Sequence, residues 1–159
     1  LDIIDRVQRR FLREIDVSEF EGFRRFNLAP LPVRRDISML GLLYRIAHGL
    51  APSSLSALFP RQVSRHFATR GAKHDVSFVD YIGHGGHTDY FRRSCFGLVT
   101  VWNMLPVDVA RAKTAKNCQR RLQEACFIWA SRNQEVDWSH FFSTQARTMP
   151  LYLFQRLFR

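Results

Sequence analysis

Lysine is scarce in this sequence: it contributes only three of the 24 lysine and arginine residues, and the other 21 are arginines. Arginine binds phosphate through two parallel hydrogen bonds and stacks on nucleobases, which lysine does less well. The formal net charge is +10 and the pI is about 10.5. A domain this basic indicates a polyanionic partner, either nucleic acid or an acidic membrane surface. GC-rich coding, which enriches arginine without selection for binding, is the alternative explanation.

Long apolar runs and paired cysteines are also missing. The uncharged stretch Ser94–Val107 has 14 residues and contains Asn103 and Pro106, and no stretch without Asp, Glu, Lys or Arg exceeds 15 residues, so none can span a bilayer. The first five residues have neither the basic start nor the apolar run of a signal peptide. The cysteines have no disulfide-like spacing, which fits a reducing compartment; they are Cys95, Cys118 and Cys126. We therefore expect an intracellular protein, in the nucleus or the cytoplasm, without a membrane partner.

Ligand sets for a metal and side chains for catalysis are scarce as well. Structural zinc needs closely spaced pairs of Cys or His; only His84 and His87 lie that close, with no Cys or further His pair near them. The acids that could join them are Asp80 and Asp89. Cys95 has no recognisable orienting group for a nucleophile, and no two aspartates are adjacent to hold magnesium. We expect no catalytic residue, no metal and no cofactor.

The composition supports a folded core, because 46% of the residues are apolar and 13% are aromatic. Helical periodicity predicts a mainly α fold, a small irregular bundle of four to five helices. The expected helices span 3–15, 19–26, 32–48, 94–104 and 115–132. Between them, residues 61–93 lack periodicity and predict a long, poorly structured loop with at most one short hairpin. The sequence thus divides into a basic helical domain at 1–132, with its irregular loop at 61–93, and an aromatic-rich C-terminal tail or helix at 133–159.

Three of these helices have an apolar face that we expect in the core. On the first helix the face consists of Ile3, Ile4, Val7, Phe11, Leu12 and Ile15. On the second long helix it consists of Val33, Ile37, Leu40, Tyr44 and Ala47. On the last helix it consists of Ala115, Cys118, Leu122, Cys126 and Trp129. Ser94 and Thr114 are expected N-caps, Gly49 is an expected C-cap, and we assign Trp102 and Pro106 to packing.

Four blocks of the sequence occur in an order and spacing that identify a family. The first is Ile4-Asp5-Arg6-Val7-Gln8-Arg9-Arg10-Phe11, and the second is Leu28–Asp36 running into Leu43–Leu50. The third is Arg93–Phe96 through Val101-Trp102-Asn103-Met104-Leu105-Pro106, and the fourth is Thr114–Leu122. Together they resemble the region that follows the catalytic domain in LINE-type (non-LTR) retrotransposon reverse transcriptases.

The resemblance implies a retroelement origin but brings no catalytic residue with it. In this family the polymerase aspartates and the endonuclease domain lie upstream of the matching region. The full protein would copy its RNA at nicked chromosomal DNA with magnesium. Because the first residue is Leu1 rather than Met, we expect a piece of a longer chain with a polymerase domain before it.

We therefore expect a non-catalytic accessory piece of a retrotransposon reverse transcriptase that binds RNA template or target DNA without sequence specificity. The residues expected to contact phosphate are Arg6, Arg9, Arg10, Arg13, Arg34, Arg35, Arg120 and Arg121. One alternative is a module that packs on the polymerase core, whose signature is an exposed apolar patch with dispersed arginines. Another is an inert retroelement relic.

Overall fold

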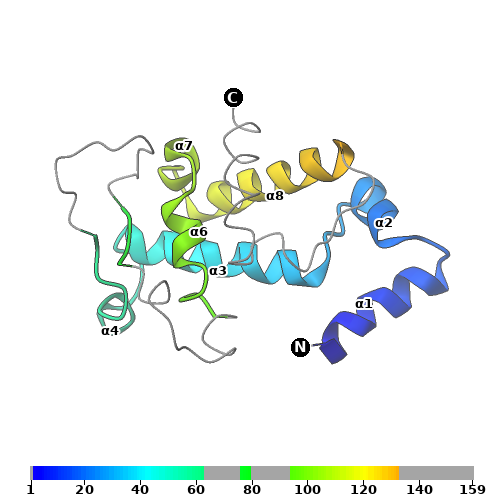
Figure 1. Ribbon diagram of the computed structural model, residues 1–159, viewed down its shortest axis with the longest axis horizontal. Helices are drawn as coiled ribbons and strands as arrows, with labels where there is room; N and C mark the ends of the chain where they lie inside the picture. The colour runs from blue at the N-terminus through cyan, green and yellow to red at the C-terminus, as the bar shows by residue number, and fades with distance from the viewer. Residues whose placement is uncertain (1, 63–75, 80–93, 133–159) are drawn as a thin grey trace.

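The computed structural model describes residues 2–62, 76–79 and 94–132 (Figure 1). This part of the chain is mainly helical and contains no strand, as the sequence predicts. The helices are α1 (Asp2–Glu14), α2 (Glu19–Phe26), α3 (Leu31–Ala47), α4 (Ser53–Ser56), α6 (Val99–Asn103), α7 (Val107–Ala110) and α8 (Ala115–Arg132). The long helices α3 and α8 run antiparallel, side by side, through the middle of the molecule (Figure 1). α1 and α2 lie at one end of this pair and α4 lies at the other.

α3 begins and ends where its sequence predicts. Pro32 stands in its first turn, where a missing N–H breaks no helical hydrogen bond. Gly49 follows the helix with φ at 70°, a left-handed backbone that suits glycine and stops the helix. The five residues predicted to face the core are all buried: Val33, Ile37, Leu40, Tyr44 and Ala47.

α8 likewise begins at its predicted cap. Thr114 Oγ1 accepts the backbone N–H of Asn117 at 3.1 Å. The predicted apolar face is buried at its centre, at Cys118, Leu122 and Cys126, and Ala115 is partly buried; the side chain of Trp129 lies outside what the structure describes. The packing of α8 on α3 is close because Gly41 faces Gln119: a methyl group at residue 41 would overlap the Gln119 amide.

The predicted helix over residues 94–104 is wrong in its first half. Residues 94–98 form turns, and α6 starts only at Val99. Ser94 Oγ accepts the N–H of Phe96 at 3.2 Å, so its hydroxyl closes a local turn instead of capping a helix. Pro106 ends this stretch as expected and also precedes α7, since its fixed φ fits the residue before a helix.

Trp102 and Asn103, both on α6, attach residues 76–79 to the bundle. The indole N–H of Trp102 donates to the Val76 carbonyl at 3.0 Å. The Asn103 side chain accepts the N–H of Phe78 at 2.8 Å and donates to the Phe78 carbonyl at 2.7 Å. Trp102 is fully buried, which confirms its assignment to packing.

The hairpin allowed by the sequence is reduced, in the described residues, to one antiparallel bridge between Arg61 and Phe78. Most of the predicted loop 61–93 and the whole predicted tail 133–159 lie outside these residues. Among the helices that the structure does describe, none combines the length and the apolar character that crossing a bilayer requires.

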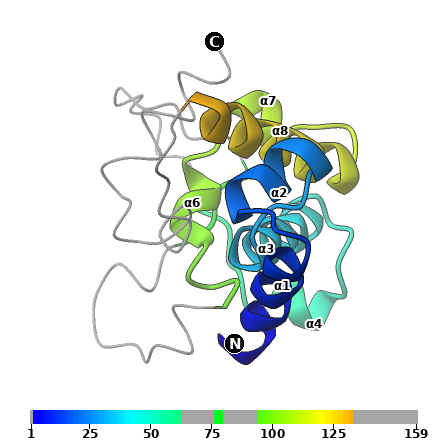
Figure 2. The same ribbon diagram turned by 90° about the vertical axis from the view of Figure 1, so that its right-hand side faces the viewer.

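α1 lies at the edge of the bundle, against α2 and α3 (Figure 2). Leu12 is buried against Gly22 of α2. The rest of the predicted core face is exposed, at Ile3, Ile4, Val7, Phe11 and Ile15. The expectation that this face enters the core is therefore wrong, because α1 touches the described bundle along one edge only, through Leu12 and its neighbours on that edge.

Candidate nucleic-acid interface

The eight arginines predicted to contact phosphate lie on three helices: four on α1, two at the start of α3 and two on α8. Five of them form ion pairs within the chain. These are Arg9–Glu19 (2.7 Å), Arg10–Glu14 (3.0 Å), Arg35–Asp5 (2.6 Å), Arg120–Glu124 (3.7 Å) and Arg121–Asp108 (2.8 Å). Three have no acidic partner among the residues that the structure describes: Arg6, Arg13 and Arg34.

The eight predicted arginines do not share one set of neighbouring residues. Arg35 of α3 reaches Asp5 of α1, and Arg121 of α8 reaches the side chain and the carbonyl of Asp108 on α7. These two guanidinium groups therefore connect helices to one another. Arg120 instead shares a groove with arginines of α2 that sequence reasoning had not selected.

This groove has a volume of about 740 Å³ and lies between the C-terminal end of α2 and the outer side of α8. Its charged lining consists of Arg24, Arg25, Arg120 and Glu124. Its apolar lining consists of Phe26, Phe127 and Ile128, of which Phe26 is 52% exposed and Ile128 is 38% exposed. Three cations against one acid make the groove electropositive.

Caps at both ends fix α2, and with it one wall of the groove. Ser18 Oγ accepts the N–H of Glu21 at 3.1 Å while the Glu21 carboxylate accepts the N–H of Ser18 at 3.3 Å. Asn27 stops the helix with a left-handed backbone at φ 56°. The last turn therefore presents Arg24 and Arg25, and the helix dipole favours cations at this end.

Direct contacts between α2 and α8 hold the two walls together. The rings of Phe23 and Phe127 meet edge to face with their centroids 5.5 Å apart. Gln123 Nε2 donates to the side-chain oxygen of Asn27 at 3.1 Å. The two helices that carry Arg24, Arg25 and Arg120 are thus held side by side.

Aromatic rings lie beside two cations of this groove: Phe26 is exposed, whereas Phe20 is partly buried against the core. The guanidinium carbon of Arg25 lies 5.7 Å from the centroid of the Phe26 ring, and that of Arg24 lies 5.5 Å from the Phe20 ring. A cation–π contact at an exposed site is worth only about 0.5–1 kcal/mol, so Arg25 can exchange its contact with Phe26 for an anion. The groove therefore offers cations for a phosphate backbone and, at Phe26, a ring face for a base.

Comparison with known protein families, with curated proteins and with solved structures finds no match to this chain. What the groove binds must therefore be inferred from the chemistry of its own residues. Sequence reasoning selected Arg120 but missed Arg24, Arg25 and Phe26. The available signal was a pair of arginines followed directly by an aromatic residue at a predicted helix end.

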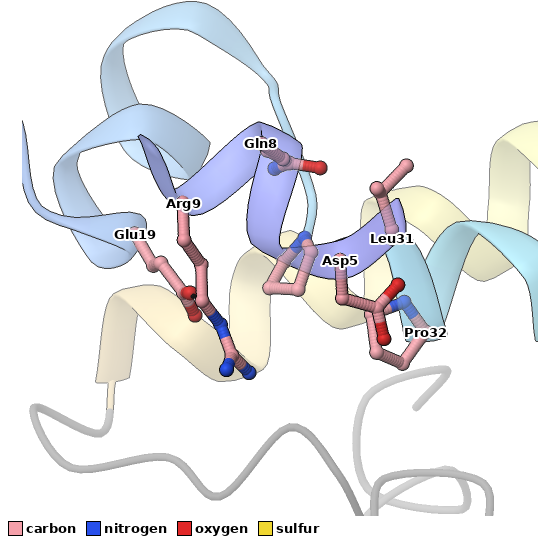
Figure 3. Close-up of a pocket in the computed structure, with 7 residues that line it drawn as sticks. Asp5, Gln8, Arg9, Glu19, Leu31 and Pro32 are labelled. Atoms are coloured by element: carbon pink, nitrogen blue, oxygen red, sulfur yellow. Dashed lines mark hydrogen bonds and ion pairs between the residues drawn. The ribbon is translucent and has the colours of Figure 1, made fainter. Parts of the chain in front are cut away.

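A second cavity, of only about 40 Å³, lies where α1 meets the turn before α3 (Figure 3). Its charged groups are already paired, Arg9 with Glu19 and Asp5 with Arg35. Gln8 donates to backbone carbonyls of the turn, while its side-chain oxygen is buried with no partner in the described structure. This volume suits a water molecule and is far too small for a nucleotide.

The cysteines are not prepared for nucleophilic attack. Burial raises the pKa of Cys95, raises that of Cys118 to about 12 and raises that of Cys126 well above its usual value. A reactive thiol needs the opposite shift. Among the described residues, no three His, Cys, Asp or Glu side chains form a group that could hold a metal ion. His84 and His87 lie outside these residues.

Proposed function

We propose that this chain is a non-catalytic, nucleic-acid-binding accessory piece of a retrotransposon reverse transcriptase, and that its binding site is the groove between α2 and α8. One observation carries the site: Arg24, Arg25 and Arg120, from two helices, line the same groove as the exposed ring of Phe26. The resemblance of four sequence blocks to the region after the catalytic domain of LINE-type reverse transcriptases supports the origin.

Binding in this groove follows from two interactions. Each phosphate neutralised by an arginine releases condensed counterions, which makes affinity fall with salt. A base stacked on Phe26 contributes about 1–3 kcal/mol, and every base has a face that can stack. Because neither interaction reads the edge of a base, we infer binding to single strands without sequence specificity.

The predicted arginines differ in how readily they can join such an interface. The Arg10–Glu14 pair is highly exposed, and an exposed pair of this kind is worth so little that phosphate can replace the carboxylate. Arg6, Arg13 and Arg34 have no acidic partner to replace among the described residues. Arg35, whose acidic partner is largely buried, is a structural residue. We therefore centre the interface on the groove and not on the Arg35 ion pair.

The test is fluorescence anisotropy of the full chain with a labelled single-stranded RNA of about 20 nucleotides and its DNA equivalent. R24A/R25A should weaken binding about tenfold at low salt and lower the salt slope by about 1.4, or about 0.7 for each lost phosphate contact. Phe26→Ala should weaken binding about fivefold and leave the slope unchanged, since stacking releases no counterions.

The matched control is R45A/K113A, which removes the same charge from two exposed residues outside the groove. This variant should bind the labelled RNA and DNA nearly as tightly as the unchanged chain does. Equal losses of affinity in the two double variants would mean that binding depends on the total charge of the chain. This would contradict the groove as the binding site. Affinity that does not change between about 50 and 200 mM salt, or no binding below about 100 μM at low salt, would contradict nucleic-acid binding itself.

The retroelement origin has its own test in the coding sequence immediately upstream of Leu1. We expect an in-frame polymerase palm with its aspartate pair, and an unrelated reading frame there would contradict the proposal. A functional piece should also show a cooperative thermal transition when purified, and an inert relic should not.

A further inference from the structure

The outer face of α1 is an apolar stripe that nothing covers in the part of the chain that the structure describes. Ile4, Val7, Phe11 and Ile15 follow one another at steps of three or four residues and cover about 17 Å of helix, with Ile3 beside them. Their exposed fractions are 76% for Ile3, 58% for Ile4, 66% for Val7, 51% for Phe11 and 44% for Ile15. This is a contiguous surface and not a set of scattered exposed residues.

Contacts on the other edge of α1 keep this stripe turned outward. Leu12 is buried against Gly22, and Asp5 forms a two-point ion pair with Arg35. Gln8 donates its side-chain amide hydrogen to backbone carbonyls of the turn before α3. Since residues 5, 8 and 12 share one edge of the helix, α1 cannot rotate to bury the stripe without breaking all three contacts.

The charges beside the stripe restrict what can cover it. The polar side of α1 exposes Arg6 and Arg13, which have no acidic partner among the described residues, and Arg10, whose highly exposed ion pair with Glu14 is weak enough for another carboxylate to replace. The chain as a whole has a net charge of +10. A second copy of α1, paired antiparallel so that the stripes match, would bring Arg6 opposite Arg13 of the other copy. Like charges at this spacing disfavour such a dimer, whereas carboxylates at the same positions would pair with the arginines.

We propose that α1 is a docking surface for an amphipathic helix of a partner protein that has an apolar stripe and acidic residues along its flank. Apolar side chains at helical spacing are the anchors used when one helix packs along another. The acidic flank of the partner lies over Arg6 and Arg10 and sets its orientation. This surface is separate from the groove between α2 and α8, so the inference does not depend on nucleic-acid binding.

The test uses the full chain and two synthetic helical peptides of about 18 residues, with the same leucine stripe but flanked by Glu in one and by Lys in the other. Titration calorimetry should show the Glu peptide binding at least about tenfold more tightly than the Lys peptide. V7S/F11S should weaken the Glu peptide about tenfold or more, and R6E/R10E should reverse the preference between the peptides.

Control variants make the outcome decisive. L50S removes a side chain that is 65% exposed and lies away from α1, so it should change neither peptide affinity. V7S/F11S should bind RNA as the unchanged chain does, which separates failure of this surface from failure of the groove.

Several results would overturn the docking surface. They are equal binding of the two peptides, no binding of the Glu peptide up to about 100 μM, or unchanged binding by V7S/F11S. Sedimentation that shows a dimer abolished by V7S/F11S would assign the stripe to a second copy. Binding of phosphatidylserine vesicles without binding of the Glu peptide would assign it to a membrane surface.

Discussion

Arg35 at the start of α3 holds Asp5 of α1 with two hydrogen bonds, from Nη1 to Oδ1 at 2.6 Å and from Nη2 to Oδ2 at 3.2 Å. The Asp5 side chain is only 12% exposed and that of Arg35 is 33% exposed, so water screens this pair less than the other ion pairs found among the described residues. The two-point geometry is the one that arginine forms best with a carboxylate. Together with the burial of Leu12 and the hydrogen bonds of Gln8, it holds α1 in the orientation that leaves its apolar stripe in solvent.

Replacing either partner of this pair should destabilise the fold. We expect Asp5→Ala to lower the free energy of unfolding by about 2 kcal/mol, because it removes charge-assisted hydrogen bonds at a partly buried site. A double-mutant cycle with Arg35→Ala, measured by urea unfolding, should give a coupling of about 1 kcal/mol. The exposed Arg10–Glu14 pair is the control, with an expected coupling of about 0.3–0.5 kcal/mol. The same coupling in both cycles would mean that Arg35 is not structural.

Asn103 should be difficult to replace. Its side chain completes both backbone hydrogen bonds of the buried Phe78, so Asn103→Ala leaves a donor and an acceptor without partners. We expect a loss of about 2–4 kcal/mol in unfolding free energy, measured as a fall in Tm and a shift in tryptophan fluorescence from the adjacent Trp102. Asn103→Asp keeps the acceptor but loses the donor, so its loss should be of similar size. A loss below about 0.5 kcal/mol in both variants would contradict this role.

Gly41 and Gln119 should be energetically coupled across the α3–α8 contact. Gly41→Ala inserts a methyl group into the position of the Gln119 amide, so this flexible side chain must move and lose its contact with the Ile37 carbonyl, and we expect a loss of up to about 1 kcal/mol. Gln119→Ala creates room, so the double variant should recover most of the loss, and the higher helix propensity of Ala over Gly adds to the recovery. Thermal unfolding of the three variants measures the recovery. If Gly41→Ala raises Tm instead, the helices are packed less closely than their geometry indicates.

Stability should fall as pH rises toward neutrality because of Asp36. Burial raises the pKa of Asp36 from 3.8 to about 7, and the nearby Arg35 only partly opposes the shift. The folded protein therefore holds a proton that the unfolded chain releases, and stability is lost between about pH 4 and pH 7. Asp36→Asn should flatten this dependence and stabilise the protein at about pH 8 by a few kcal/mol at most. Urea unfolding across this range tests it, and stability that rises with pH in both proteins would contradict it.

Local sequence was enough to predict most of the helices. The start of α8 depends on Thr114 bonding to a residue three positions away, and the end of α3 depends on Gly49 alone. The first half of the helix expected at 94–104 failed because Ser94 offers the backbone a competing hydrogen bond. The second half of this segment is helical, as predicted. It carries Trp102 and Asn103, whose hydrogen bonds reach residues 76–79, which are distant in the sequence.

The candidate site shows a different limit of prediction from the sequence. Sequence located a basic face on α1 and a basic pair on α8, but Arg120 shares its groove with Arg24 and Arg25 only because α2 packs against α8 through Phe23 and Phe127. No periodicity along one helix reports which other helix lies across from it. The eight predicted arginines therefore contained one member of the groove and not the other two.

The sequence alone determined that this protein is basic, rich in arginine and mainly helical, because charge is additive and helix caps are local. Only the tertiary structure decided which apolar faces are buried and which arginines remain available. The reason is physical: an amphipathic pattern shows that a helix has a face that can be buried, but burial also needs a partner surface. For α3 and α8 each helix supplies that surface to the other, and for the outer face of α1 none of the described residues does.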